Sequence, residues 1–151
     1  MGGLWLDPDG IGHNLVRKNP WSTYFTSQLV LLTNPHRRIT NSDLELAALV
    51  LYEAILLEAV SKSCMAAPRS GYDNTQTVYW STHESSMINP VVVDLLRICT
   101  LHSRFFFSNP SVFYHPGQEN CMAYDASCLF HLSDTAFITH MSAVHTKSHV
   151  L

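Results

Sequence analysis

The sequence has 151 residues, which is enough for one domain and short for two. Hydrophobic residues make up 46%, and charged residues only 14%, well below the usual quarter of a globular protein. This composition excludes intrinsic disorder for most of the chain. The net charge of −3 excludes nucleic-acid binding by a basic surplus alone, so such binding would need metal ions or a larger partner.

Membrane insertion is not predicted. The longest apolar stretch, residues 44–60, is short for a bilayer span and is interrupted by Glu45, Glu53 and Glu58. It therefore favours a buried helix, and we expect no membrane partner. Residues 1–8 lack the basic start and apolar run of a signal peptide, and none of the four cysteines forms a Cys-x-x-Cys pair. These features indicate free thiols and an intracellular protein, cytoplasmic or nuclear.

The first half of the chain predicts two strands and a long helix. Residues 2–6 and 26–32 read as an antiparallel pair of strands with a long connection. Ser42 precedes an apolar run and Glu45 follows three residues later, which is the capping-box pattern of a helix start. Apolar residues surround much of the helix, so it should be buried on more than one side and end near Ser61.

The second half predicts shorter elements. A strand over residues 64–72 is weakened by Pro68, because proline removes a donor from the hydrogen-bond ladder. Short helices are expected at 74–80 and 120–130, a strand at 111–114, and a turn at 115–117. Pro90 opens a second long helix at a first-turn position where its missing N–H costs nothing. Together these elements predict a mixed α/β domain with helices covering a sheet.

The apolar pattern fades after residue 132. We therefore expect one domain over residues 1–132 and a Ser/Thr/His-rich tail over 133–151. His145 and His149 are four residues apart, a spacing that could share a metal on a helix, but no third ligand stands beside them. A zinc-binding tail over residues 140–149 is thus the weakest of the hypotheses that the sequence supports.

Three acidic residues stand out by context. Glu45 lies at a helix start, Asp73 at a strand end, and Asp125 in a helix after a turn, positions that can converge at one end of a sheet. Carboxylates that converge on two Mg²⁺ ions can hydrolyse a phosphodiester. Structural roles compete with this reading: Glu45 as the capping-box partner, Asp73 as the cap of the helix beginning at Asn74, and Asp125 on a solvated face.

Four segments in order resemble the motifs of ribonuclease H domains. Thr-Asn-x-x-x-Glu at 40–45, with an apolar helix behind it, resembles the second motif. Asp-Asn-Thr at 73–75, followed by Val78 and Trp80, resembles the third motif of retroelement reverse transcriptases. Tyr-His-Pro-Gly-Gln-Glu-Asn-x-x-Ala at 114–123 resembles the fourth, and Gly-Gly-Leu-Trp at 2–5 resembles the strand after the first motif. The resemblance runs from residue 2 to about residue 130.

The resemblance implies a five-stranded mixed sheet, antiparallel over its first three strands, with helices on both faces. It also implies two Mg²⁺ (or Mn²⁺) ions and hydrolysis of the RNA strand of an RNA–DNA hybrid. Glu45 and Asp73 map onto metal-binding acids of the family. His115 maps either onto the family's flexible histidine loop, which assists product release, or onto a plain turn residue.

Two departures from the family pattern predict a truncated, decayed copy. The family's first Asp lies on a central strand before the Gly-Gly pair, and residues 1–151 do not contain that strand. The last Asp is expected four residues after Asn120, where this chain has Tyr124. Asp125 is next, but one residue along a helix is a turn of about 100°. The remaining candidate metal ligands are then Glu45, Asp73 and, after a helix shift, Asp125.

The sequence thus favours two hypotheses about function, one an enzyme domain and the other a binding module. The first is a ribonuclease H-like domain of a retrotransposon reverse transcriptase polyprotein, impaired or inactive, with RNA–DNA hybrid and the remainder of the polyprotein as partners. The second is a non-catalytic module that keeps the fold and binds nucleic acid or protein. In both readings the absent strand would leave open strand edges, which invite self-association.

Overall fold

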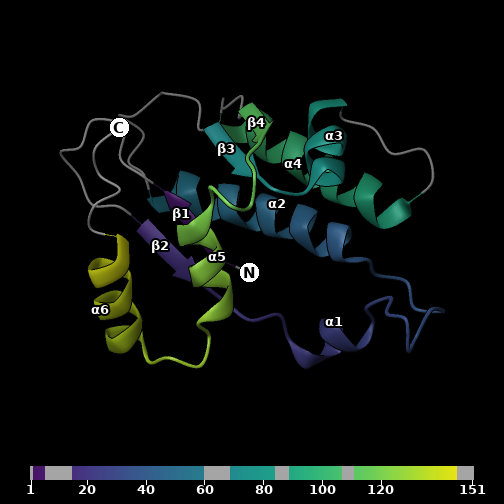
Figure 1. Cartoon of the computed structure of the whole chain (residues 1–151). Coiled ribbons are helices and arrows are strands. Elements are labelled where there is room, and N and C mark those ends of the chain that lie inside the picture. The colour runs from purple at the N-terminus through teal and green to yellow at the C-terminus, as the bar shows by residue number, and fades with distance from the viewer. Residues whose placement is uncertain (1, 6–14, 60–68, 84–88, 107–110, 146–151) are drawn as a thin grey trace. The chain divides into compact units, whose positions relative to one another are not determined.

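The computed structural model describes residues 2–5, 15–59, 69–83, 89–106 and 111–145. Its helices and strands divide into two compact units (Figure 1). One unit joins the two ends of the chain, Met1–Trp21 and Gln118–Leu151, and the other is the continuous middle, Ser22–Gly117. Helices and strands are mixed, as an α/β protein requires. The boundary expected at residues 132 and 133 does not coincide with this division.

The end-joining unit holds an antiparallel pair of strands and two helices. Strand β1 (Gly2–Trp5) pairs with β2 (Leu15–Lys18), with Gly2 opposite Lys18 and Trp5 opposite Leu15. Helix α5 (Cys121–Cys128) packs on this pair. Helix α6 (Asp134–His145) follows, within the segment expected to be a tail. It is ordered by packing, because Phe137 and Met141 are buried with Ala126 of α5.

Lys18 connects β2 to the start of α6. Its ammonium group donates a hydrogen bond to the Leu132 carbonyl and lies 3.6 Å from the Asp134 carboxylate. It also sits 4.9 Å from the centre of the Phe137 ring, at cation–π distance. The Lys18 side chain is only 12% exposed, and its ammonium group contacts all three of these groups. These contacts fix the start of α6 against β2.

The middle unit is built around one long helix. Helix α2 (Asn41–Ala59) packs against α4 (Pro90–Phe106) and α3 (Thr75–His83). Its core contains Leu46, Trp80, Val92 and Leu96, one or more from each helix. Strand β3 (Arg69–Tyr72) pairs in parallel with β4 (Ser111–Tyr114), with Arg69 opposite Ser111 and Tyr72 opposite Tyr114. Gly71 is required there, because an added Cβ would lie 2.9 Å from the His115 Cβ.

The segment 26–32 is not the second strand of the antiparallel pair, contrary to the sequence-based prediction. Helix α1 (Thr23–Ser27) takes its first two residues, and the hydroxyls of Thr26 and Ser27 bond back to carbonyls of this helix. A tight turn then bonds the Asn34 N–H to the Leu31 carbonyl at 2.8 Å. The N–H groups of Gln28 and Leu29 donate to carbonyls of the helical turn, and the Val30 N–H donates to the Ile39 carbonyl. This segment therefore does not pair with β1, and β2 does so instead.

Most other elements agree with the sequence-based expectations. The predicted helices near 42–61, 74–80 and 120–130 correspond to α2, α3 and α5, and the long helix predicted to begin at Pro90 is α4. The predicted strand at 111–114 is β4. Of the strand expected at 64–72, residues 69–72 form β3, and the part containing Pro68 lies outside the described residues. The described strands form two separate two-stranded sheets, whereas the family resemblance implies a single mixed sheet.

A buried carboxyl group lies in the middle unit. Glu53 of α2 is only 4% exposed, and the Cys99 thiol of α4 donates to its Oε2 across 3.4 Å, while Oε1 has no hydrogen-bond partner. Burial raises the pKa of Glu53 to about 7, against a smaller lowering by the Cys99 hydrogen bond. Burial, followed by the charges of Glu53, Tyr52 and Cys99, also raises the pKa of Tyr72 on β3.

Glu53 should make the protein less stable as pH rises. The folded chain keeps a proton up to a pKa of about 7, whereas the unfolded chain releases it near 4.5. This contribution is therefore fully present below about pH 4.5 and is lost as pH rises to about 7, at roughly 1.4 kcal/mol per pKa unit. Urea denaturation across this range should show the fall, and Glu53→Gln should remove the share that Glu53 contributes. The exposed Glu119→Gln variant should retain it; equal slopes in both variants would contradict the assignment.

Candidate functional site

Three helix N-termini of the middle unit are joined by side-chain hydrogen bonds. Thr40 and Asp43 form a reciprocal pair at the start of α2: the Thr40 N–H donates to Asp43 Oδ2 at 2.8 Å, and the Asp43 N–H donates to Thr40 Oγ1 at 3.2 Å. Asp43 is 1% exposed, and its Oδ1 accepts a 2.8 Å bond from Asn89, which precedes α4. One buried carboxylate therefore fixes the starts of both helices.

Helix α3 begins at the same place. The Asn74 side-chain oxygen accepts the N–H groups of Gln76 and Thr77, each at 3.0 Å, which is N-capping geometry. The Asn74 amide donates to the Ser42 hydroxyl of α2 at 3.1 Å, and the Thr77 hydroxyl donates to the Ser42 carbonyl at 3.4 Å. The starts of α2 and α3 are thus held against each other directly after β3.

These bonds identify the residues that cap α2 and α3. The capping box predicted for Ser42 and Glu45 is formed instead by Thr40 and Asp43, two residues earlier. Asn74, not Asp73, caps α3. The predicted capping roles of Glu45 and Asp73 are therefore taken by neighbouring residues, and Glu45 instead accepts a 2.8 Å bond from the Asn41 amide.

Asp73 lies close enough to Glu45 for its negative charge to affect the Glu45 pKa. Burial is the largest cause that raises the pKa of Glu45, and the negative charge of Asp73 raises it further. Hydrogen bonds with the side chains of Asn74 and Asn41 act in the opposite direction, the latter donating to Glu45 Oε1 at 2.8 Å. Two carboxylates held together in this way can share a proton or a cation.

Gly117 leaves room for the Asp73 carboxylate. A Cβ at Gly117 would lie 3.0 Å from Asp73 Oδ2, which is tighter than ordinary contact. Asp73 follows β3 and Gly117 follows β4, so the parallel pairing brings the two loops together at the carboxyl ends of both strands. His115 continues this pairing, since its N–H donates to the Tyr72 carbonyl at 2.8 Å. Its ring lies half-buried, edge-on to Phe113.

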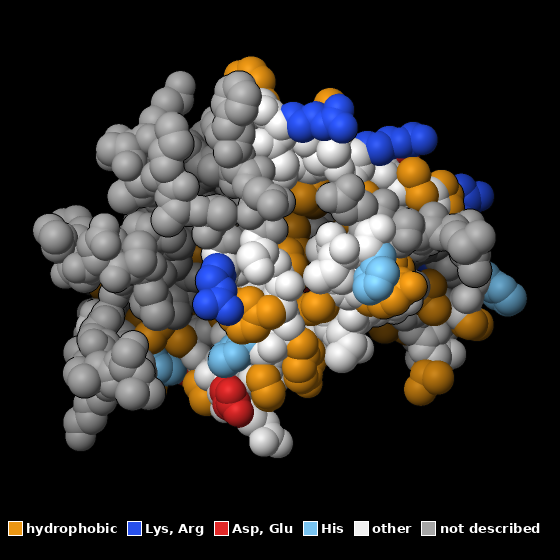
Figure 2. Space-filling model, turned by 90° about the horizontal axis from the view of Figure 1, so that it is seen from above, with side chains coloured by type: hydrophobic (Ala, Val, Ile, Leu, Met, Phe, Trp, Pro, Cys, Tyr) orange, Lys and Arg blue, Asp and Glu red, His pale blue; other side chains and the backbone are white. Residues whose placement is uncertain are grey.

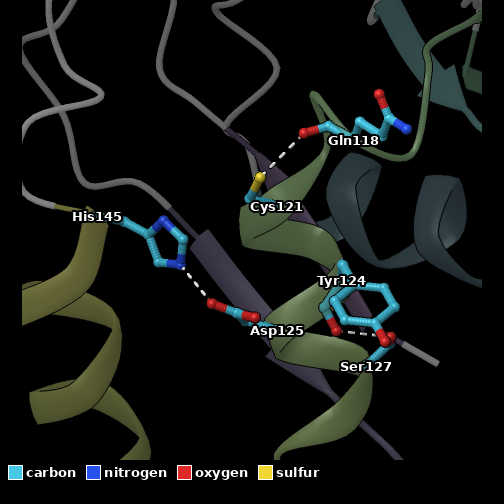
Figure 3. Close-up of polar contacts among 6 residues, drawn as sticks. All are labelled: Gln118, Cys121, Tyr124, Asp125, Ser127 and His145. Carbon is cyan, nitrogen blue, oxygen red and sulfur yellow. Dashed lines mark hydrogen bonds and ion pairs between the residues drawn. The ribbon is translucent and has the colours of Figure 1, made fainter.

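Asp125 has a different environment. It lies on α5 in the end-joining unit, where its Oδ2 is 2.9 Å from Nε2 of the buried His145 on α6 (Figure 3). The side chains of Tyr124 and Asp125 leave α5 in different directions, as the 100° step predicts, and Tyr124 is 63% exposed. His145, considered above as a metal ligand, thus makes a polar contact with Asp125. The other histidine of that pair, His149, lies outside the described residues.

The described residues contain no group of three or more His, Cys, Asp or Glu side chains arranged to hold a metal ion. Within them, too, no helix has the length and apolar character needed to cross a membrane. Comparison of the chain with protein-family models, curated proteins and solved structures finds no match.

The capping interactions missed by the sequence analysis are those of Thr40, Asp43 and Asn89. Thr40-x-x-Asp43 is itself a variant of the capping-box pattern, and Asn89-Pro90 is a typical helix start, so the local signals were present. The bond between Asp43 and Asn89 spans 46 residues, and no local pattern indicates it.

Removing the Thr40 cap should destabilise the protein. Thr40→Ala removes the acceptor of the Asp43 N–H, and loss of an N-cap costs about 1 kcal/mol. Urea denaturation of the full chain measures the change. Thr139→Ala is a matched control, because the Thr139 hydroxyl donates only to a carbonyl within its own helix. A loss at Thr40 no greater than at Thr139 would show that this cap contributes nothing.

Neutralising Asp73 should lower the pKa of Glu45. Asp73→Asn removes the like charge while keeping the side-chain shape, but burial remains, so the pKa should stay above its ordinary value. A ¹³C-detected NMR titration of the Glu45 carboxyl measures its pKa in the parent chain and in the Asp73→Asn variant. Asp94→Asn, at an exposed site on α4, is the matched control and should leave the Glu45 pKa unchanged. An unchanged value in Asp73→Asn would refute the charge coupling.

Proposed function

We propose that the chain is a ribonuclease H-like domain of a retrotransposon reverse transcriptase polyprotein, with nuclease activity impaired or lost in residues 1–151. The ancestral reaction is Mg²⁺-dependent hydrolysis of the RNA strand of an RNA–DNA hybrid. The observation that carries the proposal is the 3.1 Å bond from the Asn74 amide to the Ser42 hydroxyl, which joins the segments that resemble the family's second and third motifs. These segments contain the two acids Glu45 and Asp73.

Two features of the middle unit support this proposal. The strands that precede Asp73 and the His-Pro-Gly turn are parallel neighbours, so the segments resembling the third and fourth motifs lie side by side. The helix that carries Glu45 has its N-terminus joined to the cap directly after Asp73. Separate parts of the sequence resemblance therefore meet at one end of the β3–β4 pair.

The two carboxylates suit a hard divalent cation. Mg²⁺ and Mn²⁺ prefer carboxylate oxygens, so Glu45 and Asp73 are the residues that would hold such a cation. When bound, such ions activate water and stabilise the leaving oxygen of a phosphodiester. The chain's own contribution is to hold the two carboxylates together: Asn41 and Asn74 orient Glu45, and Gly117 gives the Asp73 carboxylate its space.

The impairment is proposed from the fourth motif. Tyr124 stands where the family pattern has an acid, and a phenol does not replace a carboxylate as a Mg²⁺ ligand. Asp125 is engaged by His145, so recruiting it would break that contact. The same observations favour a second candidate, a non-catalytic module that binds nucleic acid or protein through the retained fold.

A cleavage assay on a labelled RNA–DNA hybrid tests the proposal. Residues 1–151 should cleave poorly or not at all in Mg²⁺ or Mn²⁺, and Tyr124→Asp alone should not rescue cleavage. An added family-like Asp-bearing strand before Gly2 should give partial rescue, and both changes together the largest gain. Glu45→Gln or Asp73→Asn should abolish that gain, and the effects should be non-additive because the residues act as a unit.

Two results would contradict the proposal in different ways. Cleavage by the unmodified chain that is lost in Asp125→Asn would show an active enzyme in which Asp125 holds the metal. Absence of any gain in the doubly repaired chain, together with no Mg²⁺-induced NMR shifts at Glu45 and Asp73, would refute the family assignment. Hybrid binding without cleavage in every variant would favour the non-catalytic module.

A further inference from the structure

A loop between α1 and α2 carries three consecutive aliphatic side chains in water. This tip loop, residues 28–39, is closed at its base, where the Val30 N–H donates to the Ile39 carbonyl at 2.8 Å. In it Val30 is 38% exposed, Leu31 53% and Leu32 104%. The tip loop is therefore a turn with backbone hydrogen bonds whose aliphatic side chains are not used in the core of the middle unit.

The run of aliphatic side chains distinguishes the tip loop from exposed apolar surface in general. Figure 2 shows that hydrophobic side chains elsewhere on the surface are interspersed with polar groups. A run of three consecutive exposed apolar residues is costly in water and is typical of a site that binds a partner. Leu32 is fully exposed, so it stands out from the surface and does not line a groove.

Two arginines follow the aliphatic run in the same loop. Arg37 and Arg38 are both exposed, and the ion pairs found within the described part of the chain include neither of them. The bond between Val30 and Ile39 brings Arg38 back beside the start of the aliphatic run. The tip loop contains no acidic residue, although the whole chain carries a net charge of −3. Its partner should therefore be both anionic and apolar.

The directions of the aliphatic side chains favour a lipid surface as this partner. Successive side chains outside a helix point to different sides of the backbone, so a flat or grooved protein surface would cover only part of the run. The interface of a bilayer can surround all of it. Nucleic acid is anionic too, but aliphatic side chains do not provide the aromatic faces on which bases stack.

From the aliphatic run and the adjacent arginines we infer that the tip loop binds the surface of an anionic lipid bilayer. Leu31 and Leu32 enter the boundary between headgroups and acyl chains. Arg37 and Arg38 lie at the headgroup level, where anionic lipids attract them. The contact is peripheral and needs no bilayer-spanning segment, which is what the sequence-based expectation of no membrane partner concerned. It is independent of the proposed nuclease ancestry.

Cosedimentation of the full chain with lipid vesicles tests this inference. The parent should bind vesicles made of equal parts of phosphatidylcholine and phosphatidylserine, and should bind pure phosphatidylcholine at least about tenfold more weakly. Leu32→Ser should weaken binding to the anionic vesicles at least about tenfold, because the side chain no longer enters the acyl boundary. Leu101→Ser, at a 65% exposed site on α4, is the matched control and should leave binding unchanged.

A second pair of variants tests the arginines at matched net charge. Arg37→Gln combined with Arg38→Gln should weaken binding to the anionic vesicles at least about tenfold. Arg97→Gln combined with Arg104→Gln removes the same charge from exposed positions on α4 and should have a smaller effect. Equal losses in the two double variants would show that overall charge, and not the tip loop, determines binding.

Leu32→Trp measures insertion of the tip directly. The difference between its fluorescence emission and that of the parent should shift to the blue when anionic vesicles are added. A parent chain that does not cosediment with these vesicles would overturn the inference, as would binding that Leu32→Ser leaves unchanged while circular dichroism shows a folded chain. Binding of single-stranded nucleic acid that requires Arg37 and Arg38, without vesicle binding, would assign the tip loop to nucleic acid instead.

Discussion

The buried carboxylate of Asp43 is the constraint on which the middle unit depends. It accepts the Thr40 N–H with one oxygen and the Asn89 amide with the other, so the starts of α2 and α4 are fixed by a single group. A buried charge is tolerated only when its oxygens are satisfied, and here both are. Because the core residues Leu46, Val92 and Leu96 depend on the register of these two helices, the polar bonds and the apolar packing determine each other.

The joined starts of the helices also determine which nearby acids act as helix caps. Free N–H groups at a helix start attract negative charge, and acids near such positions are usually absorbed as caps. Here the side chains of Thr40 and Asn74 accept such N–H groups, and neither Glu45 nor Asp73 caps the helix beside it. At this junction burial, followed by the negative charge of Asp73, raises the pKa of Glu45.

The sequence predicts what depends on local pattern and misses what depends on distant contacts. The helices at Asn41–Ala59 and Pro90–Phe106 were predictable, because Ser/Thr-x-x-acid and Asn-Pro are local signals. The neighbouring placement of Glu45 and Asp73 was an expectation from motif order alone. Helix α6 was missed because Phe137 and Met141 acquire their burial only from α5. The segment 26–32 was misassigned because the backbone hydrogen bonds of a helical turn and a tight turn override its strand propensity.

The division of the chain has a consequence for the order of events on the ribosome. The middle unit is contiguous, so it can fold as soon as Gly117 has emerged, whereas β1 and β2 wait for α5, which is encoded after it. At about 5–20 residues per second, the intervening segment takes roughly 5–20 seconds to synthesise. During that time the β1–β2 pair lacks the helix that packs on it, so nascent chains expose it to chaperones or to one another until α5 is made.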